Sequence, residues 1–171
     1  MDITVALAFS EQDAVSLLNW LARTNARILR ENPGLPGVYQ SGVVYKRETT
    51  ETWSDYINLL AQGWEDCDSL AAARAGELLA RGYQALGPGD GGYKEARRLR
   101  LRRIQAEVFL RTRSRPDEPG LYHCLVRYRV GGRWYLDDPS ARLGMLDRRL
   151  SSAEVQQRLT LQTQPKTGRR G

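Results

Sequence analysis

The residues best suited to covalent chemistry are one histidine and two cysteines, His123, Cys67 and Cys124. Cys67 comes first along the chain, His123 follows, and two adjacent acids, Asp137 and Asp138, come after the histidine. A thiolate can attack a carbonyl carbon, an imidazole can transfer the proton, and a carboxylate can hold the imidazole in one tautomer. The order Cys, His, Asp therefore predicts a thiol hydrolase or an acyl transferase.

The spacing of apolar residues places Cys67 in the first turn of a helix that begins near Asp66. The apolar positions of this helix are Leu70, Ala71, Ala75, Leu78 and Leu79. Arg81 and then Gly82 provide the cation and the left-handed cap expected at its end. The free N–H groups of the first turn favour a thiolate and lower its pKa. Asp66 and Asp68 oppose this effect unless they point outward or pair with arginines.

Gly131-Gly132 predicts a two-residue hairpin loop between strands at 121–130 and 133–138, with the second strand ended by Pro139. In this register Val130 faces Arg133. A three-residue loop or a bulge would shift the pairing by one residue and reverse the faces of one strand.

The two-residue loop places His123 and Asp138 on the same face of the sheet, as diagonal neighbours within about 7–8 Å. A carboxylate at this position can accept a proton from one imidazole nitrogen. Cys124 and Asp137 then lie on the opposite face, so we expect Cys67 to be the nucleophile. In the shifted register Asp137 would replace Asp138, and the alternation of apolar residues does not decide between the two.

Other elements follow from periodicity and from turn residues. We expect a strand at 2–9, a helix at 11–30 with a capping box at its start, and extended pieces up to residue 45. Trp53, Ile57 and Leu60 predict a short amphipathic helix. A flexible glycine-rich loop at 87–92 and a strand at 106–111 complete the pattern.

Two segments resemble the transglutaminase-like branch of the papain superfamily. Residues 63–70, Gly-Trp-Glu-Asp-Cys-Asp-Ser-Leu, resemble its nucleophile segment. Residues 122–140 resemble its His strand, its Gly-x-Trp turn and its closing Asp-Pro-Ser. This likeness implies an α+β fold in which N-terminal helices, with the catalytic Cys at a helix N-terminus, pack on an antiparallel β-sheet. It also implies Asp138, the residue before Pro139, as the third catalytic residue.

A narrower likeness is to small transglutaminase-like proteins of tailed bacteriophages and prophages. It rests on the segments 41–48, 66–68 and 138–145 and covers roughly residues 33 to 146. It implies a substrate among virion proteins or in the peptide of the host cell wall. The expected location is the cytoplasm of a bacterial host, the virion, or both.

An acyl-transfer site also needs donors for the oxyanion. The backbone N–H of Cys67 is one. Gln62 is a second candidate, because papain-like proteases carry a Gln-Gly pair shortly before the nucleophile, as Gln62-Gly63 stands here. Trp53 or Tyr56 could serve instead, although aromatic residues in such positions more often belong to the core.

The composition narrows the class of protein. The 171 residues include no long apolar run, and the acidic start, Met1-Asp2, is unlike a secretion signal. We therefore expect a soluble chain with free thiols, one domain over 1–159 and a polar, flexible tail over 160–171. The expected partners are a protein or peptide substrate and other virion proteins, bound through the basic surface and tail.

The net charge of +6 is concentrated in the run 94–103, which holds six cationic residues. A run of this kind can contact phosphate, but it is more often the solvated face of an element next to the core. No nucleic-acid motif accompanies it, so nucleic acid is not among the expected partners. Cys67, His123 and Cys124 lack zinc-ligand spacing, and we expect no metal and no cofactor.

The leading hypothesis is therefore an enzyme, either a peptidase or amidase if water resolves the thioester, or a transglutaminase if an amine does. The alternative is a virion structural or assembly protein that retains the fold without essential catalysis.

Overall fold

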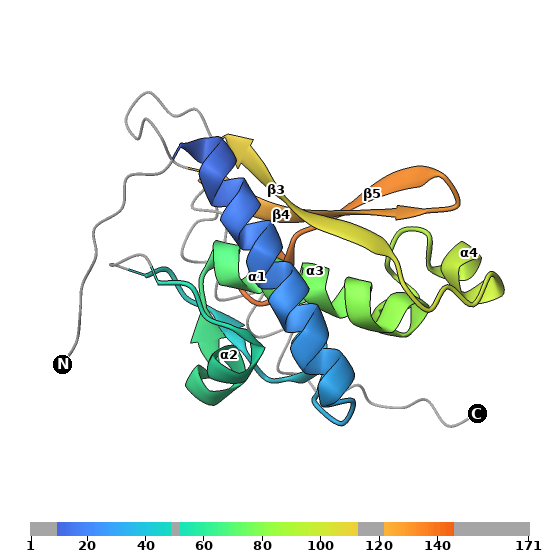
Figure 1. Cartoon of the computed structure of the whole chain (residues 1–171), viewed down its shortest axis with the longest axis horizontal. Helices are drawn as coiled ribbons and strands as arrows, with labels where there is room; N and C mark the ends of the chain where they lie inside the picture. Colours follow the sequence, from blue (N-terminus) through green and yellow to red (C-terminus); the bar gives the residue numbers. More distant parts are fainter. Residues whose placement is uncertain (1–9, 49–51, 113–121, 146–171) are drawn as a thin grey trace, which may run out of the picture.

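The computed structural model describes residues 10–48, 52–112 and 122–145. Helices from the N-terminal part of the chain pack on a three-stranded antiparallel sheet with the order β3-β4-β5, so the predicted α+β class is confirmed (Figure 1). The principal elements are α1 (Glu11–Glu31), α3 (Cys67–Arg81), β3 (Gln105–Thr112), β4 (Tyr122–Val130) and β5 (Arg133–Asp137).

The start of α1 is held by the capping box that the sequence predicts. The Ser10 hydroxyl accepts a hydrogen bond from the Asp13 N–H, and the Asp13 carboxylate accepts one from the Ser10 N–H, both at 3.2 Å. These bonds satisfy donors that would otherwise have no partner at a helix start. From there α1 crosses α3 and lies over the sheet (Figure 1).

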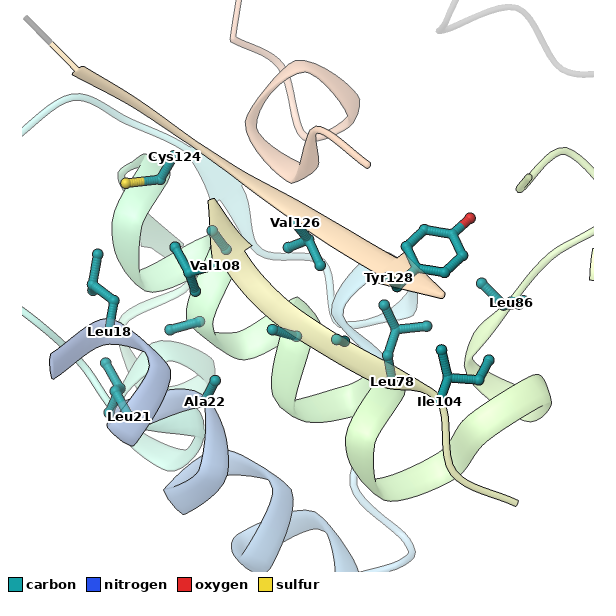
Figure 2. Close-up of a cluster of buried hydrophobic side chains, with 14 of the residues drawn as sticks. Leu18, Leu21, Ala22, Leu78, Leu86, Ile104, Val108, Cys124, Val126 and Tyr128 are labelled. Carbon is teal, nitrogen blue, oxygen red and sulfur yellow. The ribbon is translucent and has the colours of Figure 1, made fainter. Parts of the chain in front are cut away.

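One face of the sheet carries the main core. The strands have period two, so alternate residues of β4 point toward α1 and α3. Figure 2 shows Cys124, Val126 and Tyr128 of β4 in this cluster, with Val108 from β3 and Leu18 and Leu21 from α1. Cys124 is therefore a core residue near the start of β4, only 5% exposed.

A second cluster joins α1, α2 (Tyr56–Gln62) and the other side of α3. The Asp55 side chain caps α2, so this helix begins three residues after Trp53. The predicted apolar face was therefore partly wrong. Tyr56 and Leu59 are buried, whereas Ile57 is 45% exposed. The N-cap decides where a short helix begins and therefore which of its side chains face the core. The spacing of apolar residues alone did not locate this N-cap.

The hairpin has the predicted two-residue loop. Pairing runs from Val130 opposite Arg133 to Val126 opposite Asp137. Gly131 and Gly132 have φ of 56° and 81°, as the favoured two-residue turns require. The shifted register is thereby excluded.

The cap of α3 differs from the expected left-handed one. Gly82 has a positive φ of 58°, but its ψ of −128° lies outside the left-handed helical region. A Cβ there would also lie 2.0 Å from the carbonyl oxygen of Leu101. Glycine is thus required at this position by its backbone angle and by close approach of the chain.

The shorter elements surround this frame. They are β1 (Val44–Tyr45), β2 (Trp64–Glu65), α4 (Tyr93–Arg98), α5 (Pro139–Arg142) and the 3-10 turns η1 (Val38–Gln40) and η2 (Gly82–Ala85). The predicted strand at 2–9 and tail at 160–171 lie outside the described residues. None of the helices in the described ranges combines the length and apolar character that a membrane crossing needs.

A buried arginine ties α3 to the sheet. Arg74 is fully buried, and its Nε donates to Asp137 at the end of β5 at 2.8 Å. Its other nitrogens reach Glu77 at 2.9 Å and Asp90 at 3.4 Å. Arg81 also pairs with Glu77, and Arg142 pairs with Asp90 and Asp137. The buried carboxylates therefore depend on Arg74 and on these two partly exposed arginines for charge compensation.

Candidate active site

Cys67 is the first residue of α3, as the sequence predicts, and Asp66 is the N-cap. The Asp66 side chain accepts a hydrogen bond from the Asp68 N–H at 3.3 Å. The thiol is half-buried. Cys67 therefore stands where helix N–H groups and the helix dipole favour an anion.

The chain before Cys67 is held by a short parallel pairing of β1 with β2. The Lys46 N–H donates to the Glu65 carbonyl at 2.9 Å, and the Tyr45 N–H donates to the Leu143 carbonyl at 2.9 Å. Strand β1 thus connects the segment that leads to Cys67 with the segment that follows Asp138.

His123 lies on β4 and is 5% exposed. Its Nε2 is 2.8 Å from Oδ2 of Asp138. The other oxygen of Asp138 accepts the Ala141 N–H at 3.0 Å, because Asp138 is also the N-cap of α5, with Pro139 as the first helical residue. Each oxygen of this carboxylate thus has a defined role, and its orientation toward His123 is set by the cap.

Asp137 lies on the opposite face of the hairpin, as the register requires. It is 8% exposed and is bound by Arg74. The structure therefore brings Asp138 to the imidazole and leaves Asp137 in the buried ion network.

The surroundings of Cys67 lower its pKa to about 6. The largest cause is hydrogen bonding from the Cys124 thiol, which outweighs the opposing effect of burial. His123 and the Cys124 backbone N–H lower the pKa further, whereas the charge of Asp66 raises it. The pKa values of the two cysteines thus shift in opposite directions, because the thiolate of Cys67 raises the pKa of the buried Cys124 well above its ordinary range.

His123 changes in the complementary direction. Burial disfavours its cation, but hydrogen bonds to Asp138 and Cys67 outweigh burial and raise its pKa to about 9. Between about pH 6 and pH 9 the favoured state is therefore a thiolate beside an imidazolium. With Nε2 held by Asp138, the Nδ1 atom remains for Cys67.

The three side chains considered as oxyanion donors differ in their surroundings. The Gln62 side chain donates from Nε2 to the Trp64 carbonyl at 3.1 Å, so a role as an oxyanion donor requires that bond to open. Tyr56 is fully buried and its hydroxyl donates to the Pro36 carbonyl at 3.0 Å, which is a core position. Trp53 packs partly buried against the main core.

Glu65 was missed by sequence reasoning. This residue is fully buried two positions before Cys67, and burial raises its pKa to about 7. The parallel pairing of β2 points its side chain inward, and a two-residue strand is too short for alternation to reveal this.

Comparisons with protein-family models, with curated proteins and with solved structures found no match to this chain. Within the described ranges, no three His, Cys, Asp or Glu side chains are grouped so that they could hold a metal ion. The arrangement joins a low-pKa thiol, an imidazole and an oriented carboxylate, which together can form and resolve a thioester.

Proposed function

We propose that this protein is a thiol-dependent acyl-transfer enzyme of the transglutaminase-like branch of the papain superfamily, acting on a carboxamide or peptide bond. The observation that carries the proposal is the array at the start of α3, where Cys67 and His123 interact and His123 is bonded to Asp138 at 2.8 Å. The motif resemblance of residues 63–70 and 122–140 supports the same assignment.

In this mechanism the Cys67 thiolate attacks the carbonyl carbon of the substrate, and the negative charge moves to the carbonyl oxygen. The Cys67 N–H is available for that oxygen at the helix start. The imidazolium of His123 then gives its proton to the leaving nitrogen, the carbon–nitrogen bond breaks, and a thioester forms on Cys67.

The second half-reaction regenerates the thiol. The imidazole of His123, now neutral, accepts a proton from water or from an amine as it attacks the thioester. Collapse of this intermediate expels the Cys67 thiolate and restores the ion pair. Asp138 holds the ring orientation through both halves and stabilises the imidazolium each time it forms. Water yields a peptidase or amidase, and an amine yields a transglutaminase.

The phage likeness favours a virion protein or a cell-wall peptide as the substrate. A suitable test incubates the protein with glutamine-containing peptides and with cell-wall stem peptides, each with and without a biotinylated primary amine. Intact-mass spectrometry would follow acylation of Cys67, and peptide mapping would follow hydrolysis or amine incorporation. The expected result is an acyl adduct on Cys67 that is released by water or by the amine.

Two variants provide the controls. Cys67→Ala should form no adduct, whereas Cys124→Ala keeps the nucleophile and should still form one, at a rate changed by the loss of one hydrogen-bond donor. If no acylation occurs with either substrate class and Cys67→Ala leaves phage infectivity unchanged, the enzyme proposal fails and the structural role becomes the better account.

A further inference from the structure

A basic groove lies at the end of α3 that is remote from Cys67. Its volume is about 1500 Å³, and it is lined by the ends of α1 and α3, by η2, by α4 and by the turn into β3. No acidic residue lines it among the residues that the structure describes. Five of its cations form no ion pair within the described ranges. They are Arg30, Lys94, Arg97, Arg100 and Arg102.

The two remaining cations of the groove are already neutralised. Arg98 pairs with Glu95 at 2.8 Å, and Arg81 pairs with Glu77 at 3.8 Å. The other five side chains are exposed. Like charges so close together repel one another, and a polyanion in the groove would remove that repulsion while releasing its counterions.

The backbone at the end of α4 provides an independent observation. The Leu101 N–H donates to the Ala96 carbonyl at 3.1 Å, and the Arg100 N–H donates to the Arg97 carbonyl at 3.1 Å. This is the Schellman pattern, in which the residue at the position of Arg100 takes a left-handed conformation and is usually glycine. Arg100 has φ of 48°, and it is the only residue other than glycine with a positive φ in the described part of the chain.

Arginine at this position is unfavourable for the backbone. Its presence keeps a cation among the residues that line the groove, between Arg97 and Arg102 in the chain. Two half-buried tyrosine rings, Tyr83 and Tyr93, line the same groove. Cations that follow a phosphate chain, together with aromatic rings that bases can stack on, are the two features of surfaces that bind single strands.

We propose that this groove binds single-stranded nucleic acid. The site is separate from the catalytic one, since the length of α3 places about 20 Å between Cys67 and Arg81. The proposal differs from the sequence-based interpretation of residues 94–103 as a solvated face. In the structure most cations of this run line one groove, together with Arg30 of α1. The proposal does not depend on catalysis.

The test measures fluorescence anisotropy of a labelled oligothymidylate with the full chain at several salt concentrations. Five phosphate contacts on a single strand predict a slope of log K against log salt of about −3.5. Removing three of the five cations in Arg97→Ala/Arg100→Ala/Arg102→Ala should reduce the slope to about −1.4 and weaken binding more than tenfold at low salt.

A matched variant controls for net charge. Arg23→Ala/Arg47→Ala/Arg133→Ala removes the same number of charges from exposed positions outside the groove. It should retain the wild-type slope and most of the affinity. Cys67→Ala should bind as the wild type does, which separates this proposal from the catalytic one.

A single substitution separates binding from folding. Arg100→Gly should leave the melting temperature equal or higher, because glycine suits the left-handed position, and yet it should weaken oligonucleotide binding severalfold. The proposal is overturned if the two triple variants lose affinity equally, if the wild type shows no binding at low salt, or if labelled hexaglutamate binds more tightly than oligothymidylate of equal charge.

Discussion

The state of Cys67 can be measured directly by alkylation with iodoacetamide between pH 4.5 and 10. A pKa of about 6, compared with an ordinary value of 9.0, corresponds to about 4 kcal/mol in favour of the thiolate. At pH 7 about nine-tenths of the protein would carry the thiolate, compared with about 1% for a cysteine with the ordinary pKa of 9.0. The rate should therefore reach half its maximum near pH 6.

The controls identify the source of the lowered pKa. His123→Ala removes one hydrogen bond to Cys67, so the midpoint should rise by about one pH unit or more. Asp138→Asn preserves the α5 cap, because asparagine caps as well as aspartate. This substitution should lower the pKa of His123. The thiolate–imidazolium pair should then be lost at a lower pH than in the wild type. Circular dichroism of each variant would establish that it is folded.

Mass spectrometry would locate the label. Cys124 is buried and its pKa is raised, so it should remain unmodified across the range. The reasoning would be refuted if Cys67 reacted with a midpoint near pH 8.5 in both the wild type and His123→Ala, because the thiol would then have no activating partner.

Three further predictions concern the frame of the site. Arg74→Met removes the fully buried cation of this network, so its buried carboxylates keep only the partly exposed Arg81 and Arg142 as partners. This change should lower the free energy of unfolding by about 3–5 kcal/mol in a urea titration. Gly76→Ala places a Cβ 2.7 Å from Cβ of Asn25 on α1. Overpacking of about 1–3 kcal/mol exceeds the gain in helix propensity of up to about 1 kcal/mol, so this variant should also be less stable. Because burial raises the Glu65 pKa to about 7, its contribution to stability is complete below pH 4.5 and is lost as the pH rises through 7. The melting temperature should fall across that range in the wild type and should fall less in Glu65→Gln.

Each of these three predictions has a control variant or an outcome that would contradict it. Arg23→Met removes an exposed arginine of α1 and should change stability by less than about 0.5 kcal/mol. A Gly76→Ala protein as stable as the wild type would mean that α1 and α3 can separate without cost. A pH profile of melting that is identical in the wild type and in Glu65→Gln would mean that this carboxyl titrates normally.

Local patterns in the sequence determined much of the frame. The capping box at Ser10 and the helix start at Asp66 depend on neighbours within three or four residues, so spacing was sufficient to predict them. The glycine pair at 131–132 determined the loop type, and the loop determined the register. That register placed Asp138, rather than Asp137, beside His123.

Contacts between segments that are distant in the sequence could not be predicted from local patterns. The interaction of Cys124 with Cys67 arises because the first turn of α3 packs near the start of β4, and no local pattern encodes that approach. The inward position of Glu65 and the charge network of Arg74 have the same origin. The sequence by itself determined which residues could form a triad, because hairpin parity and helix caps are local. Only the tertiary structure decided which groups surround the thiol and set its pKa, because desolvation and charge depend on every element packed around it.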